Sequence, residues 1–201
     1  MKLQLESTNK ADFLRPIDGI IDYETQIVQE KINEIKNSTD KVREQAELAF
    51  NFVRDEIDHS FDTNSKVITI SASDTLNKKE GICFAKSHLL AALLRGLGIP
   101  AGFCYQRVLR KGTVESGYAL HGLNALYLDE VGWFRVDPRG NKEGINSEFS
   151  TDKEKLAYPI RTELGEIDYP EVYSNPLPSV IESMNDSKDC HALFFNRPEA
   201  I

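Results

Sequence analysis

Three polar residues from separate parts of the chain have side chains that together can carry out nucleophilic catalysis: Cys83, His121 and Asp137. Cys83 follows Gly81 and Ile82 and is expected in the first turn of an apolar helix. The start of a helix has free backbone N–H groups and a partial positive charge, and both favour a thiolate over a thiol. Cys83 is therefore placed where a cysteine becomes a nucleophile.

His121 is predicted to begin one strand, and Asp137 to end the hairpin partner of that strand. The interval between them, 137 − 121 = 16 residues, returns the chain around a hairpin to the side where it began. Neighbours across two paired strands have Cβ atoms roughly 4.5–5.5 Å apart, so a carboxylate there can hold an imidazole. Cys83 completes the set if the helix start abuts the same edge of the sheet.

These residue types suit acyl transfer. A thiolate attacks a carbonyl carbon, and an adjacent imidazole takes the thiol proton and later returns it to the leaving group. A carboxylate fixes the imidazole tautomer and stabilises its positive form. A backbone N–H at the helix start can donate to the oxyanion. The first product is a thioester, which either water or an amine releases.

Periodicity predicts the elements that position these residues. Apolar side chains at helical spacing indicate amphipathic helices from about residue 25 to 36 and over 41–57. A third helix, roughly 83–96, is apolar around most of its circumference and is expected to be buried. Ser71 can cap a brief helix that ends near Leu76. Strands are predicted over 101–109, 121–128 and 133–136, with a further possible strand at 67–70. Helices followed by an antiparallel sheet indicate an α+β fold, with the N-terminal helices and the buried helix packed on that sheet.

The length of 201 residues suits a single domain over 1–201, with a core at about 65–140. Residues 141–201 are expected to wrap irregularly over the surface and to contain one short helix near Val180–Met184. A net charge of −8 argues against a nucleic acid or an anionic membrane surface as partner.

The first residues contain no apolar run long enough for a signal peptide, and no stretch is long enough to span a bilayer. The three cysteines are far apart, which favours reduced thiols and a cytoplasmic location. Cys190 and His191 lack a second pair of metal ligands, so we expect no metal and no cofactor. The oligomeric state is open.

Three blocks in order resemble the bacterial transglutaminase-like family: Gly81-Ile82-Cys83 with the helix ending Leu93–Ala101, His121 before a strand, and Gly132–Pro138. The resemblance covers about residues 65–140. It implies a core similar to papain-type cysteine proteases, with Cys83 as nucleophile, His121 as base and Asp137 as the orienting acid. It also implies transfer or hydrolysis of an acyl group from a peptide or other small amide substrate, without a metal in the catalytic step.

Two positions depart from the family pattern. Family members often have His-Ala-Trp where this chain has His121-Gly122-Leu123, so an apolar wall beside the histidine is missing. Arg139 follows Asp137-Pro138 in place of the commoner threonine, and it either points elsewhere or binds a carboxylate. The main alternative is therefore a non-catalytic binding module that keeps this fold.

Other polar residues carry simpler expectations. Cys83 alone would be interpreted as an inert core residue, and Cys104 is expected in the core. His88 lies well around the helix from Cys83, so it is expected to be structural, with pocket lining as the alternative. His59 is expected at the surface. A papain-type protease is disfavoured because its histidine usually lies roughly 130–150 residues after the cysteine.

Overall fold

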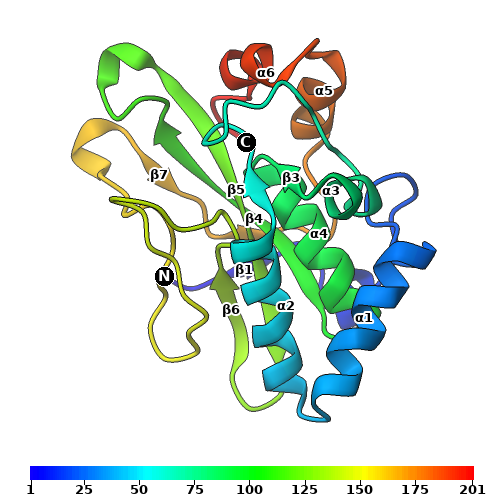
Figure 1. Ribbon diagram of the computed structural model, residues 1–201. Coiled ribbons are helices and arrows are strands. Elements are labelled where there is room, and N and C mark those ends of the chain that lie inside the picture. The colour runs from blue at the N-terminus through cyan, green and yellow to red at the C-terminus, as the bar shows by residue number, and fades with distance from the viewer.

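The computed structural model describes residues 1–201 as an α+β structure (Figure 1). The helices are α1 (Gln26–Ser38), α2 (Val42–Glu56), α3 (Ala72–Lys78), α4 (Cys83–Gly96), α5 (Pro178–Asp186) and α6 (Cys190–Asn196). The strands are β1 (Gln4–Leu5), β2 (Asp58–His59), β3 (Glu80–Gly81), β4 (Ala101–Leu109), β5 (Tyr118–Leu128), β6 (Gly132–Val136), β7 (Ile167–Asp168) and β8 (Glu171–Val172). Short 3-10 helices occupy Lys10–Phe13, Val114–Ser116 and Thr162–Leu164.

Helix α4 lies at the centre of the fold. It packs against α1, α2 and α3 on one side and against β4 and β5 on the other (Figure 1). Every residue from Cys83 to Arg95 is buried, which confirms the interpretation of this apolar helix as an internal one. A helix enclosed on all sides holds its first residue in a fixed place, and in this protein that residue is Cys83.

Two charged residues of α4 are buried with polar partners. Lys86 donates to the backbone carbonyls of Ile57 and Arg54, which lie at the C-terminal end of α2. Arg95 donates to the carbonyls of Ala101, Arg15 and Ser174. A cation beside carbonyl groups at a helix end is favourable, and a guanidinium can bond several acceptors at once. These side chains tie α4 to segments far from it in sequence.

The four-stranded sheet has the order β6-β5-β4-β7, and all its pairs are antiparallel. The β5–β6 hairpin pairs Asn124 with Val136 as its last partners. Asp137 lies one residue beyond that pair, so it is not a direct cross-strand neighbour of His121. The expectation of a hairpin that returns the carboxylate toward the histidine is met, with the two residues offset along the strands. The expectation that His121 begins its strand was wrong, because β5 starts three residues earlier, at Tyr118.

The C-terminal part of the chain is more regular than its sequence pattern indicates. It contains α5 and α6 where one short helix was expected, and its strands β7 and β8 pair with β4 and β1. Side chains of Val180, Met184 and Leu193 belong to the main hydrophobic core. None of the helices is both long and apolar enough to cross a membrane.

Residues 67–70 form no strand, so that prediction was wrong. The carbonyl of Ile70 in this segment lies 2.8 Å from Nδ1 of His88 and not against a strand. The side chain of Thr69 donates to the carbonyl of Glu80 in β3 at 2.9 Å. The brief helix after Ser71 is confirmed as α3, and the Ser71 hydroxyl accepts a hydrogen bond from the N–H of Asp74.

Candidate active site

Cys83 is the first residue of α4, and the preceding Ile82 has extended backbone and no side chain that could cap the helix. The N–H groups of the first turn therefore lack a side-chain acceptor at the cap position, and they are the donors available to an oxyanion. Strand β3 delivers the chain to this point, because Gly81 pairs with His59 of β2 immediately before the helix begins.

Gly122 allows the start of α4 to approach β5 closely. A Cβ atom at this position would lie 2.6 Å from Cδ1 of Phe84, which is closer than such atoms can stand. Only glycine fits there without displacement of the ring. Because Phe84 follows Cys83 and Gly122 follows His121, this contact holds the thiol near the imidazole.

His121 and Asp137 form a buried hydrogen-bonded pair. Nε2 of His121 lies 2.8 Å from Oδ2 of Asp137, and the carboxylate is fully buried. The carboxylate also accepts from the backbone N–H groups of Ala157 (3.0 Å) and Arg139 (3.1 Å). Since Nε2 bonds the carboxylate, Nδ1 is the ring nitrogen left for the thiol. The structure thus brings Cys83, His121 and Asp137 together.

The three groups shift one another's pKa values. Burial opposes a charged imidazole, but the Asp137 carboxylate and the Cys83 sulfur outweigh it and raise the pKa of His121 to about 9. Burial also opposes the thiolate, yet His121, Arg197 and the backbone N–H of Gly122 lower the pKa of Cys83. Both directions favour a thiolate–imidazolium pair. Catalytic hydrogen bonds of this kind commonly tighten as the reaction proceeds.

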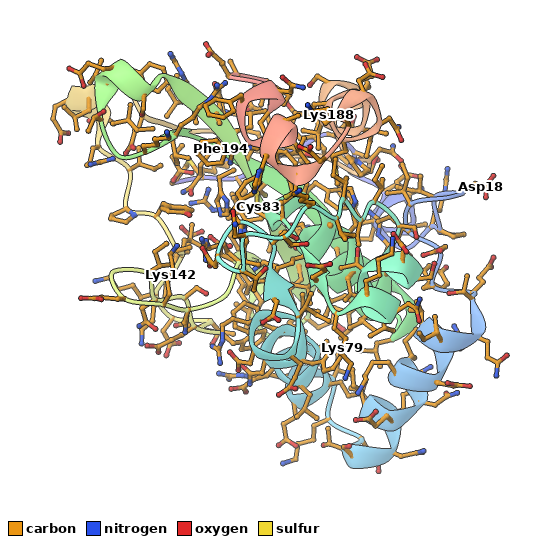
Figure 2. The ribbon with its side chains drawn as sticks, turned by 45° about the horizontal axis from the view of Figure 1, so that its top comes forward. Asp18, Lys79, Cys83, Lys142, Lys188 and Phe194 are labelled. Atoms are coloured by element: carbon orange, nitrogen blue, oxygen red, sulfur yellow. The ribbon has the colours of Figure 1, made fainter.

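Cys83 lines a cavity of about 480 Å³, although only 1% of its surface is exposed. We call this space the Cys83 cavity. Figure 2 shows Cys83 between Phe194 and Lys142, two further residues of the cavity wall. The wall also contains His121 and several side chains of the segment after β6, whereas Phe194 is the contribution of α6. A cavity of this size can hold a small substrate or one end of a peptide.

The wall of the Cys83 cavity is strongly cationic in a protein of net charge −8. Its charged side chains are Arg110, Arg139, Lys142, Arg161, Arg197, Asp62 and Glu166. Arg139 and Lys142 both pair with Asp62, and Arg161 pairs with Glu166. Arg139 therefore binds a carboxylate of the protein itself, which settles the alternative left open by the sequence.

Tyr158 supplies an aromatic wall beside the histidine. Its ring meets the His121 imidazole edge-on, with centroids 4.8 Å apart, and Arg139 donates to its hydroxyl at 3.0 Å. Leu123 cannot serve this purpose, because it is buried in a small cluster with Phe13 and Cys104. No periodic pattern distinguishes Tyr158 in the sequence, since the segment that carries it has no regular structure.

His59 is not at the surface, so that expectation was wrong. It is 7% exposed and lines the Cys83 cavity, because β2 runs beside β3 at the base of α4. Burial, and then the charge of Arg139, hold its pKa well below the usual range, and its Nδ1 has no hydrogen-bond partner in the protein. Its position depends on a strand of two residues, which is too short to recognise from sequence.

The remaining candidates have structural roles. His88 is buried and its Nδ1 lies 2.8 Å from the carbonyl of Ile70, as expected for a residue outside the site. Cys104 lies in the core, and burial raises its pKa to about 12. All three cysteines are unpaired. No cluster of three or more His, Cys, Asp or Glu side chains is arranged to hold a metal ion.

The fold is α+β, and it holds Cys83, His121 and Asp137 together at the start of its central helix. The family model described as the transglutaminase-like superfamily matches residues 28–138, more than half of the chain. The protein therefore belongs to the transglutaminase-like superfamily. The match contains Cys83, His121 and Asp137, whereas α5, α6 and Arg197 lie outside it.

A solved structure of similar fold supports this assignment. A candidate cysteine protease from Cytophaga hutchinsonii superposes with a TM-score of 0.52 at 19% identity, over 66% of this chain and 43% of that one. The periplasmic domain of TgpA from Pseudomonas aeruginosa gives a TM-score of 0.47 at 17% identity, over 64% and 46%. The chain thus spans less than half the length of these proteins. No curated protein matches the sequence.

Proposed function

We propose that the protein is a thiol-dependent enzyme that transfers or hydrolyses the acyl group of an amide, with Cys83 as nucleophile, His121 as acid and base, and Asp137 as the orienting carboxylate. One observation carries the proposal: the buried His121–Asp137 pair, at 2.8 Å, stands beside a cysteine at the uncapped start of a helix. Membership of the transglutaminase-like superfamily supports it.

The residues suit a two-step reaction. The Cys83 thiolate attacks the carbonyl carbon, and the first-turn N–H groups of α4 stabilise the oxyanion. The C–N bond then breaks, and the amine leaves with the proton of the His121 imidazolium. A thioester remains on Cys83. Water or an amine attacks it while His121 takes a proton, and cleavage of the C–S bond regenerates the thiolate.

Trapping of the acyl group tests this proposal without knowledge of the substrate. The protein is incubated with p-nitrophenyl acetate, and the mass of the intact chain and of its peptides is measured. We expect one acetyl group on Cys83, removable by hydroxylamine. In a separate reaction without the ester, iodoacetamide should alkylate the same thiol rapidly at neutral pH. Cys104→Ser and Cys190→Ser should be labelled as the unaltered protein is. If Cys83 is labelled no faster than a free thiol, the proposal is wrong.

The low exposure of Cys83 favours one competing function, a binding module that keeps the fold and performs no chemistry. Cys83→Ala separates the two. A binding module would retain ligand or partner binding and cellular activity in this variant, whereas the proposed enzyme should lose all turnover with its fold intact. Circular dichroism and the unfolding temperature establish that the variant is folded.

A further inference from the structure

Arg197 is the exception among the cations of the Cys83 cavity. It follows α6 and lies within the wall, yet it is only 8% exposed and forms no ion pair. Arg139, Lys142, Arg161 and Arg110 each have a carboxylate of the protein within ion-pair distance. Removal of an isolated charge from water is strongly unfavourable unless another charge or a set of hydrogen bonds compensates it.

The protein compensates the Arg197 charge only in part. Its Nε donates to the carbonyl of Phe194 at a long 3.4 Å, and its terminal nitrogens donate to nothing in the protein. The guanidinium carbon lies 5.0 Å from the ring centroids of both Phe61 and Phe194. Two aromatic faces hold a guanidinium in place but leave its in-plane donors free.

The position of Arg197 is fixed by backbone contacts with the strand that carries the histidine. The N–H of Leu120 donates to the carbonyl of Pro198 at 2.7 Å, so the chain directly after Arg197 pairs beside the residue preceding His121. The N–H of Arg197 in turn donates to the carbonyl of Leu193. A guanidinium held in this way is preorganised on the same cavity as Cys83 and His121.

We propose that Arg197 binds a carboxylate of the substrate, so that the substrates of this enzyme are amides with a free carboxylate close to the bond that is cleaved. The inference rests on the proposed thiol chemistry, because it concerns the substrate of that same site. A guanidinium binds a carboxylate through two parallel hydrogen bonds, and the free terminal nitrogens of Arg197 provide such a pair of donors. The carboxylate would complete the pairing that the protein leaves open.

Two alkylating reagents of nearly the same shape test this inference. Iodoacetate carries a carboxylate and iodoacetamide does not, and both alkylate Cys83. The rate with iodoacetate divided by the rate with iodoacetamide is measured for the protein and for glutathione in the same buffer. We expect the ratio at Cys83 to exceed that of glutathione by about tenfold, in line with the strength of a charge-assisted hydrogen bond.

Variants assign the preference to one side chain. Arg197→Gln should reduce the ratio to that of glutathione, Arg197→Lys should retain part of it, and the matched cavity cation Lys142→Gln should leave it nearly unchanged. A wild-type ratio equal to that of glutathione overturns the inference even if every variant fails to fold. Equal slowing of both reagents in Arg197→Gln overturns it as well, since that would mean that Arg197 acts only on the thiolate.

The outcomes separate this inference from the proposed function. If Cys83 reacts with neither reagent faster than a free thiol, the enzyme proposal fails. If it reacts rapidly with both and shows no preference, only the carboxylate site fails. If the preference is found, protection of Cys83 from iodoacetamide identifies the source of the carboxylate. N-acetyl-alanine represents a terminal carboxylate and N-acetyl-glutamate α-amide a side-chain carboxylate. N-acetyl-alaninamide is the neutral control. Protection by neither acid counts against the inference.

Discussion

The ring of Tyr158 meets the imidazole of His121 edge-on, with the two centroids 4.8 Å apart. From the sequence we expected the histidine to lack an apolar wall, because residue 123 is a leucine and not the tryptophan common in the family. Leu123 is buried in a separate hydrophobic cluster. The aromatic neighbour of the histidine is therefore provided by a segment that lies outside the part of the chain matched by the family model.

Removal of the Tyr158 ring should weaken the positioning of His121. We expect Tyr158→Ala to slow acetylation of Cys83 by roughly two- to tenfold, the equivalent of an aromatic pair. Tyr158→Phe keeps the ring and loses only the hydrogen bond from Arg139, so it should remain close to the unaltered rate. Stopped-flow measurement of p-nitrophenolate release gives both rates. Equal losses in the two variants would show that the hydroxyl, and not the ring, is what matters.

Asp137→Asn should have a larger effect. The amide can no longer stabilise the imidazolium, and it can hold the wrong tautomer of His121, so we expect acylation to fall on the order of 10²–10⁴-fold. The buried N–H groups of Ala157 and Arg139 also lose a charged acceptor, so the free energy of unfolding is measured alongside. A folded variant with unchanged acylation would exclude Asp137 from the mechanism.

The rate of thioester formation should depend on pH in the form of a bell. The pKa of Cys83 is lowered, so the midpoint of the acid limb should lie at a lower pH than the pKa of an ordinary thiol. The pKa of His121 is raised to about 9, so the imidazolium loses its proton and the rate declines as pH rises through that value. In Asp137→Asn the carboxylate that raises the His121 pKa is gone, and the alkaline limb should move to lower pH. Initial rates of p-nitrophenyl acetate turnover across pH, corrected for hydrolysis in buffer, give the profile.

The sequence predicted the elements whose pattern is local. The helix over 83–96 and the strand over 101–109 match α4 and β4, because their apolar residues recur at short spacings. Cys83 and Asp137 could be identified because they lie at the start of α4 and directly after β6, and His121 because it lies near the start of β5. Tyr158, Arg197 and the contact of Arg139 with Asp62 could not, because they depend on contacts between residues far apart in the sequence and on segments without periodicity.

Arg95 should contribute to stability through its shape as well as its charge. Its guanidinium reaches the carbonyls of Ala101, Arg15 and Ser174, and a lysine presents its donors from a single atom. We expect Arg95→Lys to lower the free energy of unfolding by roughly 2–3 kcal/mol, since at least one buried carbonyl would lose its partner. Chemical denaturation measures the change. The exposed Arg15→Lys serves as control and should remain within about 0.5 kcal/mol.

Gly122 allows a test of whether close packing of α4 on β5 is needed for reactivity. Gly122→Ala places a methyl group 2.6 Å from Cδ1 of Phe84, and relief of that clash must move the ring or the start of the helix. We expect a loss of about 1–3 kcal/mol in the free energy of unfolding and slower alkylation of Cys83, because the thiol moves from the imidazole. The double variant Gly122→Ala/Phe84→Leu gives the new methyl group room, so it should recover part of both losses. Recovery of stability without recovery of reactivity would show that the Phe84 ring itself positions Cys83. A Gly122→Ala protein that is as stable and as reactive as the original would mean that the close approach of helix and strand has no role in bringing thiol and imidazole together.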